Sequence, residues 1–242
     1  MVERVGNSLR LERKVEPGNV QSEWDCENQV APDYAGTMAS MAREALKDRR
    51  RPQRILLLGL GGGTIAGDLL CGGTTRLADW RLHVTAIESD ADVAAAAHEH
   101  FSPEMFRGQP YELEQNHLSV IVADAVELVR DRPFRGEKFD VILEDFAYES
   151  PGLLQADFWR ALRERYAARD ATLIINTLYP ERSQMEEFEL ELQDAGWSDV
   201  QQLVDRGLQA LPGEPKLSWD TADWEPLDNM IFLAKNQEQA VD

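Results

Sequence analysis

The chain has 242 residues, 43% of them hydrophobic, and its 44 acidic and 25 basic side chains give a formal charge of −19. This length suits one domain with a short appended segment, and the acidic excess disfavours a nucleic-acid substrate, whose phosphates normally require a basic stripe. No apolar run approaches the ~18 residues of a membrane span and the N-terminus lacks an apolar signal core, so we expect a cytoplasmic protein that crosses no membrane.

Residues 1–50 are predicted to form a small N-terminal unit. Two short mixed segments flank Pro17-Gly18 and predict a hairpin within residues 1–30. Apolar residues recur at helical spacing over residues 33–48, and this helix is expected to cover a cofactor cleft with Tyr34 and Met38 facing inward. The basic run over residues 47–54 is interpreted as a solvated connector.

From Arg54 onward, strand and helix patterns alternate, which is typical of a parallel sheet with right-handed crossovers. Residues 51–242 are therefore expected to form one α/β domain with helices on both faces of its sheet. Strands are predicted at 54–58, 82–88, 118–123, 138–145, 171–177, 198–205 and 229–235. Helices are predicted at 64–71, 90–101, 124–130, 154–168 and 182–195.

The most informative motif follows the first of these strands. An apolar run ends at Gly59, and Gly59, Gly61, Gly62 and Gly63 lie within five positions, directly before a helical pattern. Without side chains the backbone of such a turn can approach a ligand closely and direct free N–H groups toward it. The motif predicts a nucleotide-like cofactor at the carboxyl edge of an open α/β sheet.

Three further predicted strands end in acids. Glu88 closes the second strand, where a carboxylate is well placed to accept hydrogen bonds from both ribose hydroxyls, although a helix-capping or solvated role is the alternative. Asp124 follows the third strand, and Glu144-Asp145 closes the fourth. Together with the glycine turn, these acids form a more specific signal than any one of them alone.

The glycine turn does not match the phosphate-binding motifs. The dinucleotide fingerprint is met at Gly59 and Gly61 but has Thr64 at its last position, and no lysine is present for a P-loop. A phosphate-free alternative is S-adenosylmethionine, with Asp124 accepting from the exocyclic amine of the adenine. An acidic pocket also tolerates a sulfonium cation better than a pyrophosphate.

Metal chemistry is not expected. The only cysteines, Cys26 and Cys71, form no metal-spaced pair, and the four histidines do not group into a ligand set. With only two cysteines in the chain, a reducing cytoplasm is the default expectation.

Several motifs together resemble the spermidine synthase-like branch of the class I S-adenosylmethionine-dependent transferases. They are Leu58-Gly-Leu-Gly-Gly-Gly63, Ala86-Ile-Glu-Ser-Asp90, Ala123-Asp-Ala125, Phe139-Asp-Val-Ile-Leu-Glu-Asp145 and Ile174-Ile-Asn176, preceded by Val20-Gln-Ser22 and Pro32-Asp-Tyr34. The resemblance implies a Rossmann-like sheet of seven strands with the last antiparallel. It also implies S-adenosylmethionine, or its decarboxylated form, as cofactor, and it makes a homodimer an expectation. The pocket residues that it implies are Gln21, Gly59, Gly61, Gly62, Glu88, Asp124, Ala125 and Asp145.

The chain departs from the aminopropyltransferase pattern at two acids. Those enzymes carry a first-loop motif similar to Gly-Gly-Gly-Asp-Gly-Gly, and Gly62 is taken to occupy its Asp position. After the fourth strand they carry a motif similar to Asp-Ser-Ser-Asp-Pro, and Tyr148 stands at its second Asp. The candidate catalytic residues are Asp145, Tyr148 and Glu149, which lie on the loop expected to face the methyl group. An acid there can steer an amine or accept a proton, and Tyr148 can orient the acceptor or contact the sulfonium.

The sequence therefore favours methyl transfer to a small acceptor, which could carry an amine. The alternatives are an aminopropyltransferase that uses the decarboxylated cofactor, and a non-catalytic cofactor-binding or interaction protein. Residues 206–228 form a long insertion with Trp219 and Trp224, interpreted either as an acceptor-site lid or as a hairpin pinned to the sheet edge.

Overall fold

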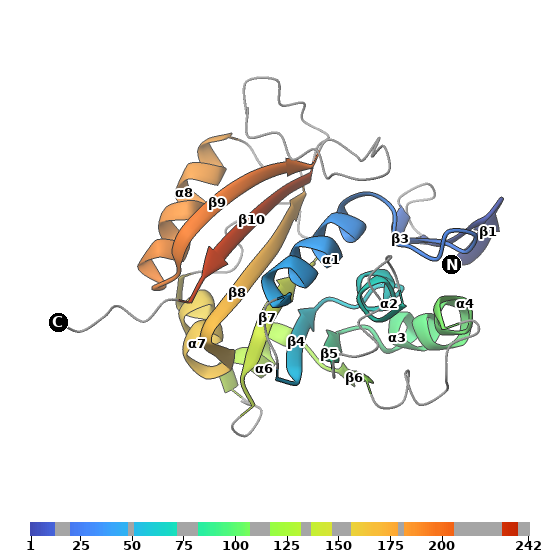
Figure 1. Cartoon of the computed structure of the whole chain (residues 1–242), viewed down its shortest axis with the longest axis horizontal. Coiled ribbons are helices and arrows are strands. Elements are labelled where there is room, and N and C mark those ends of the chain that lie inside the picture. The colour runs from blue at the N-terminus through green and yellow to red at the C-terminus, as the bar shows by residue number, and fades with distance from the viewer. Residues whose placement is uncertain are drawn as a thin grey trace.

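A seven-stranded sheet forms the centre of the molecule (Figure 1). In this computed structural model, the described residues are 1–12, 20–47, 51–71, 82–106, 117–131, 137–146, 156–178, 182–205 and 229–236. The strands are β4 (Gln53–Leu58), β5 (Leu82–Glu88), β6 (Leu118–Val122), β7 (Phe139–Glu144), β8 (Ala167–Leu178), β9 (Ser198–Asp205) and β10 (Asn229–Lys235). All seven predicted strands are present.

The order of the strands is β6-β5-β4-β7-β8-β10-β9. Only β10 is antiparallel to the others, since it pairs antiparallel with both β8 and β9, and the expected antiparallel last strand is thereby confirmed. The chain extends from β4 toward β5 and β6 on one side and toward β7 and β8 on the other. The strand order therefore reverses between β4 and β7, which is where open α/β sheets bind their ligands, at the carboxyl ends of the strands.

Helices cover both faces of the sheet (Figure 1). They are α1 (Asp33–Leu46), α2 (Thr64–Cys71), α3 (Ala91–Ala96), the π-helix η2 (Ala97–Phe101), α4 (Ser102–Met105), α6 (Ala125–Asp131), α7 (Ala156–Tyr166) and α8 (Arg182–Asp194). Side chains alternate along β4, so that Ile55 and Leu57 enter a core with α1 and α2, whereas Leu56 and Leu58 enter a second core with α7 and α8. The strand is buried on both faces, which explains its uninterrupted apolar sequence.

The predicted helix 154–168 is wrong at its C-terminal end. Helix α7 ends at Tyr166, and β8 begins at the next residue, four residues before the predicted strand. Ala167 pairs with Phe139 at the start of β7, and an irregularity separates this pair from the regular register of Val141 with Thr172. Pairing with a distant strand therefore overrides the local helical pattern.

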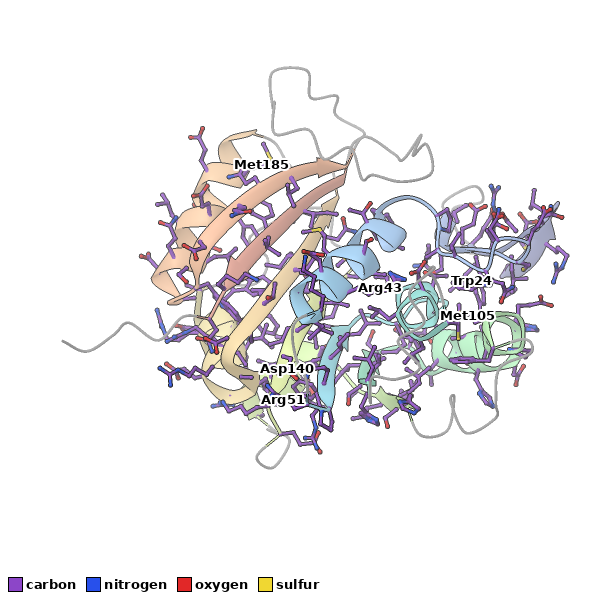
Figure 2. The ribbon with its side chains drawn as sticks, in the orientation of Figure 1. Trp24, Arg43, Arg51, Met105, Asp140 and Met185 are labelled. Atoms are coloured by element: carbon purple, nitrogen blue, oxygen red, sulfur yellow. The ribbon has the colours of Figure 1, made fainter. Side chains whose placement is uncertain are left out.

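The N-terminal unit contains a three-stranded antiparallel sheet. Strands β2 (Ser8–Glu12) and β3 (Val20–Asp25) pair as the expected hairpin, although its Pro17-Gly18 turn lies outside the described residues. The added strand β1 (Val2–Val5) pairs with β2 through a turn at Gly6, whose φ of +60° suits glycine. Trp24 on β3 is fully buried near α2 and α4 (Figure 2).

One residue of the basic run makes a specific contact that the prediction of a solvated connector missed. The guanidinium of Arg51 forms a two-pronged ion pair with Asp140 on β7, whose side chain is 1% exposed (Figure 2). Asp140 Oδ2 also accepts the backbone N–H of Arg54 at 3.0 Å. These contacts join the starts of β4 and β7, at the opposite end of the strands from the glycine turn.

Candidate active site

The glycine turn connects β4 to α2, and its backbone donors are all occupied. Each N–H from Gly59 to Gly63 donates to an acceptor within the protein. The pairs are Gly59 with Ile87 O (2.9 Å), Leu60 and Gly61 with Glu88 Oε2 (3.2 and 3.1 Å), Gly62 with Ser22 Oγ (2.7 Å), and Gly63 with Leu60 O (2.8 Å). The turn therefore presents no unpaired N–H group to a phosphate, in contrast to the loops that bind anions.

Glycine is required at position 59 for two reasons. Its φ is +91°, which L-residues rarely adopt, and a Cβ there would lie 2.4 Å from the carbonyl oxygen of Asp145. The backbone of β4 can thus lie directly against the loop after β7. Gly59 and Asp145 consequently adjoin each other at the reversal of strand order.

The N-terminal sheet closes over the next part of the turn. A Cβ at Gly61 would meet Ser22 Oγ at 2.5 Å, and a Cβ at Gly62 would meet the ring of Phe101 at 2.8 Å and Ser22 Cβ at 2.9 Å. At Gly62, the position of the missing acid, a side chain would have to displace the Phe101 ring and Ser22, whereas at Gly61 it would displace the Ser22 hydroxyl and adopt a φ of +55°. The crowding gives a structural reason for the missing first-loop acid.

Glu88 lies at the end of β5, and its carboxylate accepts hydrogen bonds from the backbone of the glycine turn. Its Oε2 accepts from Leu60 and Gly61, while its Oε1 accepts the N–H of Asp90 at 3.0 Å and has a longer 3.5 Å contact with the Ser89 hydroxyl. The carboxylate is therefore fixed in orientation. Oε1 keeps capacity for a further donor, because its hydroxyl contact is at the limit of hydrogen-bond distance.

Asp124 and Ala125 follow β6 at the same edge. Asp124 is exposed, and its Oδ1 caps α6 by accepting the N–H groups of Val126 and Glu127 at 2.8 and 3.0 Å. A carboxylate at a helix N-terminus is stabilised by the unpaired donors of the first turn. Ala125 is buried.

Asp145 is held by two elements that are distant in sequence. Its Oδ1 accepts from Asn176 Nδ2 of β8 at 2.9 Å, and its Oδ2 accepts from the Tyr34 hydroxyl of α1 at 3.4 Å. Burial raises the pKa of this carboxyl to about 6, and the bonds from Asn176 and Tyr34 act in the opposite direction. As predicted, Tyr34 faces inward, and Met38 is buried in the core.

Asn176 adds a second acceptor beside this carboxylate. Its side chain is 3% exposed, and its Oδ1 is buried without a hydrogen-bond partner among the described residues. A buried carbonyl oxygen that lacks a donor costs free energy, about 1–3 kcal/mol, unless a ligand supplies one. The pair thus offers two adjacent oxygens to a hydrogen-bond donor.

The structure brings together only part of the predicted site. Gly59, Gly61, Gly62, Glu88 and Asp145 lie around one turn, whereas Gln21 precedes Ser22 on β3 and its side chain leaves the opposite face of that strand. Tyr148 and Glu149 lie outside the described residues, as does the 206–228 insertion.

Sequence reasoning did not assign a role to Ser22 or Asn176. Both belong to motifs that carried the resemblance, and Asn176 is a polar residue at the end of an apolar strand. The position of Asn176 at the end of its strand was the signal that could have identified it as a site residue, because the carboxyl ends of neighbouring parallel strands meet at one edge of the sheet.

Two features are absent from the described ranges. No helix there combines the length and apolar character that a bilayer crossing requires. In the same residues, no group of three or more His, Cys, Asp or Glu side chains is arranged to hold a metal ion.

The strand order and the helices on both faces define a class, the Rossmann-like α/β fold. The crystal structure of a probable spermidine synthase from Corynebacterium glutamicum has a TM-score of 0.65 at 17% identity, covering 98% of this chain and 77% of that one. A spermidine synthase in complex with the transition-state analogue AdoDATO gives 0.57 at 14% identity, covering 100% and 73%. The methyltransferase domain of bacterial CtHen1-C gives 0.56 at 16% identity, covering 87% and 99%.

These structural neighbours are spermidine synthases and class I S-adenosylmethionine-dependent methyltransferases, as the sequence motifs suggested. Their identities to the chain are low, so the likeness is one of fold. No protein-family model and no curated protein matches the sequence.

Proposed function

We propose that the protein is a transferase that binds S-adenosylmethionine at the glycine turn and transfers its methyl group to a small acceptor carrying an amine. The observation that carries this proposal is the occupied turn. Each N–H from Gly59 to Gly63 already has an acceptor, and the carboxylates of Glu88, Asp124 and Asp145 border the same sheet edge. Such an edge favours a cation over a pyrophosphate.

The residues present fit an adenosyl sulfonium group. Glu88 Oε1 would accept a ribose hydroxyl, and Asp124, whose Oδ1 caps α6, would accept the adenine amine with its other oxygen. Ala125 is a further proposed pocket residue, from the resemblance, and Gln21 would join it only if its side chain left the face of β3 that it occupies, opposite to Ser22. When bound, the cofactor supplies a methyl group on a positively charged sulfur, which is a good leaving group.

Asp145 would bind and deprotonate the acceptor. The ammonium form of an amine can donate to Asp145 and to the unpaired Oδ1 of Asn176. The carboxylate would take one proton from the ammonium group, which frees the nitrogen lone pair of the acceptor to attack the methyl carbon that the bound cofactor would supply. A carboxyl pKa of about 6 makes Asp145 a stronger base than a solvated aspartate by about two units, or roughly 3 kcal/mol.

Aminopropyl transfer with the decarboxylated cofactor is the second candidate. The amine-binding oxygens of Asp145 and Asn176 would serve that reaction equally well, and the fold likeness to spermidine synthases covers nearly the whole chain. The crowding at Gly62 argues against it, since an acid at that first-loop position would meet the Phe101 ring at 2.8 Å and Ser22 Cβ at 2.9 Å. Tyr148 and Glu149 remain proposed acceptor-side residues for either reaction.

Calorimetric titration with S-adenosylmethionine, its decarboxylated form and methylthioadenosine, in parallel, tests the proposal. Tightest binding of the intact amino-acid form supports methyl transfer, and a screen of amine acceptors with a labelled methyl group then follows. Tightest binding of the decarboxylated form supports aminopropyl transfer instead. Binding of none of the three would contradict both and favour an interaction protein.

A further inference from the structure

Glu144 is a buried acid that the proposed reaction does not use. It is the last residue of β7, it is 2% exposed, and its register neighbours are Leu58 of β4 and Ile175 of β8. Both neighbours belong to the apolar core on the α7 and α8 face of the sheet. No cation pairs with Glu144 among the described residues, so a purely structural role as half of an ion pair does not account for it.

The Glu144 side chain forms a hydrogen bond with the backbone of Phe146, two residues along the chain. Glu144 Oε1 accepts the backbone N–H of Phe146 at 2.9 Å, a bond that spans the intervening residue. Phe146 packs against the same core as Leu58 and Ile175. Asp145 points to the opposite face, where Tyr34 of α1 bonds it.

The backbone of Asp145 is thus fixed from two sides. On one side, its N–H donates to Leu58 O at 2.8 Å, and its carbonyl lies where Gly59 leaves no room for a Cβ. On the other side, the Glu144–Phe146 bond closes the turn by which the chain leaves the strand. The orientation of the Asp145 side chain toward Tyr34 and Asn176 therefore depends on this turn as well as on the contacts with β4.

We propose that Glu144 is a positioning residue, which acts as an uncharged hydrogen-bond acceptor for Phe146 and thereby holds the Asp145 carboxylate beside Tyr34 and Asn176. Burial, followed by the neighbouring charge of Asp145, raises the pKa of Glu144 well above its ordinary range, in agreement with an uncharged form. The structural claim stands by itself, and its bearing on catalysis rests on the proposed role of Asp145 in binding the acceptor.

Two variants separate hydrogen bonding from charge and packing. Glu144→Gln keeps a carbonyl acceptor of the same shape without any charge, whereas Glu144→Met keeps comparable volume and loses the acceptor. Carboxyl ¹³C NMR is used to titrate Asp145 in both variants and in the original protein, with Asp145→Asn to assign the resonance. Circular dichroism and urea unfolding show whether each variant is folded.

We expect Glu144→Gln to leave the Asp145 midpoint near 6 and Glu144→Met to lower it by roughly one unit or more, because a carboxyl that turns toward water loses the effect of burial. An unchanged midpoint in Glu144→Met would overturn the proposal. So would a large downward shift in Glu144→Gln, because it would mean that Glu144 carries a charge beside Asp145. Since this readout requires no acceptor and no turnover, failure of methyl transfer leaves it unaffected.

Discussion

The side-chain amide of Asn176 donates to Asp145 Oδ1 across 2.9 Å, which links the carboxyl ends of β7 and β8 beside the glycine turn. The carbonyl oxygen of the same amide has no partner among the described residues, although it is buried. The two side chains therefore place a carboxylate and an amide oxygen next to each other. A protonated amine, with three donors, can satisfy both at once.

Amine binding should depend on the ionisation of Asp145. The carboxyl is charged above its pKa of about 6 and neutral below it, so the affinity for 1,4-diaminobutane in the presence of methylthioadenosine should fall by roughly tenfold per unit as the pH drops below 6. Calorimetry at pH 5, 6, 7 and 8 measures this. Asp145→Asn should bind the amine weakly with no inflection near pH 6, and an inflection retained in that variant would assign it to another group.

The same carboxyl should make the folded state less stable as the pH rises. Its pKa is about 6 in the fold against an ordinary 3.8, so the folded state binds the proton more tightly. The protonated carboxyl contributes its stability fully below about pH 3.8, and this contribution is lost as the pH rises through 6. Relative to the original protein, Asp145→Asn should gain roughly 1–3 kcal/mol of unfolding free energy between pH 4.5 and pH 7.

Urea unfolding at the two pH values measures that gain. Comparison of the two proteins at each pH removes the contributions of other buried acids, such as Asp68, whose pKa is also raised by burial. A difference that does not change with pH would mean that Asp145 titrates normally in the folded protein.

Loss of the Glu88 carboxylate should weaken cofactor binding. Glu88→Ala should reduce the affinity for methylthioadenosine by about 1–3 kcal/mol, since it leaves ribose hydroxyls unpaired and also releases the N–H groups of Leu60 and Gly61. Titration calorimetry measures this, with exposed Glu99→Ala as the control. Equal affinities in the two variants would place the ribose elsewhere.

A methyl group at Gly59 should disturb the site more than a methyl group at another glycine with positive φ. Gly59→Ala meets the Asp145 carbonyl at 2.4 Å, whereas Gly6→Ala, at φ +60°, has no atom within 4 Å. Gly6→Ala should therefore cost about 1 kcal/mol from backbone strain alone, and Gly59→Ala should cost about 2 kcal/mol more. Thermal unfolding compares the two, and similar losses would mean that the Asp145 loop moves aside.

The two arginines of the connector should differ in their contribution to stability. Arg51→Met removes the guanidinium that pairs with buried Asp140 and should lower the unfolding free energy by about 1–3 kcal/mol. Arg54→Met removes only an exposed 4.0 Å pair with Glu137 and should change it by at most about 0.5 kcal/mol. Urea unfolding of the two variants at pH 7 provides the comparison, and an Arg51→Met variant as stable as Arg54→Met would mean that water replaces the guanidinium.

The sequence predicted those parts of the site that depend on local signals. The glycine turn, the acids at the strand ends and the strand–helix alternation each occupy a short window, so they could be located before the structure was known. The partners of these residues could not. Ser22 is 40 residues from Gly62, and Asn176 is 31 residues from Asp145, and both contacts arise only from the order of the strands and the docking of the N-terminal sheet.

The end of α7 was mispredicted for the same reason. Residues 167 and 168 were predicted as helix and 169 and 170 as neither helix nor strand, but all four belong to β8, whose first residue pairs with β7. For Asp124, the sequence predicted the position after β6 but not the hydrogen bonds by which its side chain caps α6.

The position of β10 constrains how the protein reaches its native state. β9 pairs with no described strand other than β10, and β10 inserts between β8 and β9, both of which precede it in the chain. During synthesis, β9 therefore has no strand partner until residues 229–235, which form β10, have left the ribosome. Such long-range closure slows folding and exposes a strand edge to other chains, so a product truncated before β10 should be prone to aggregation.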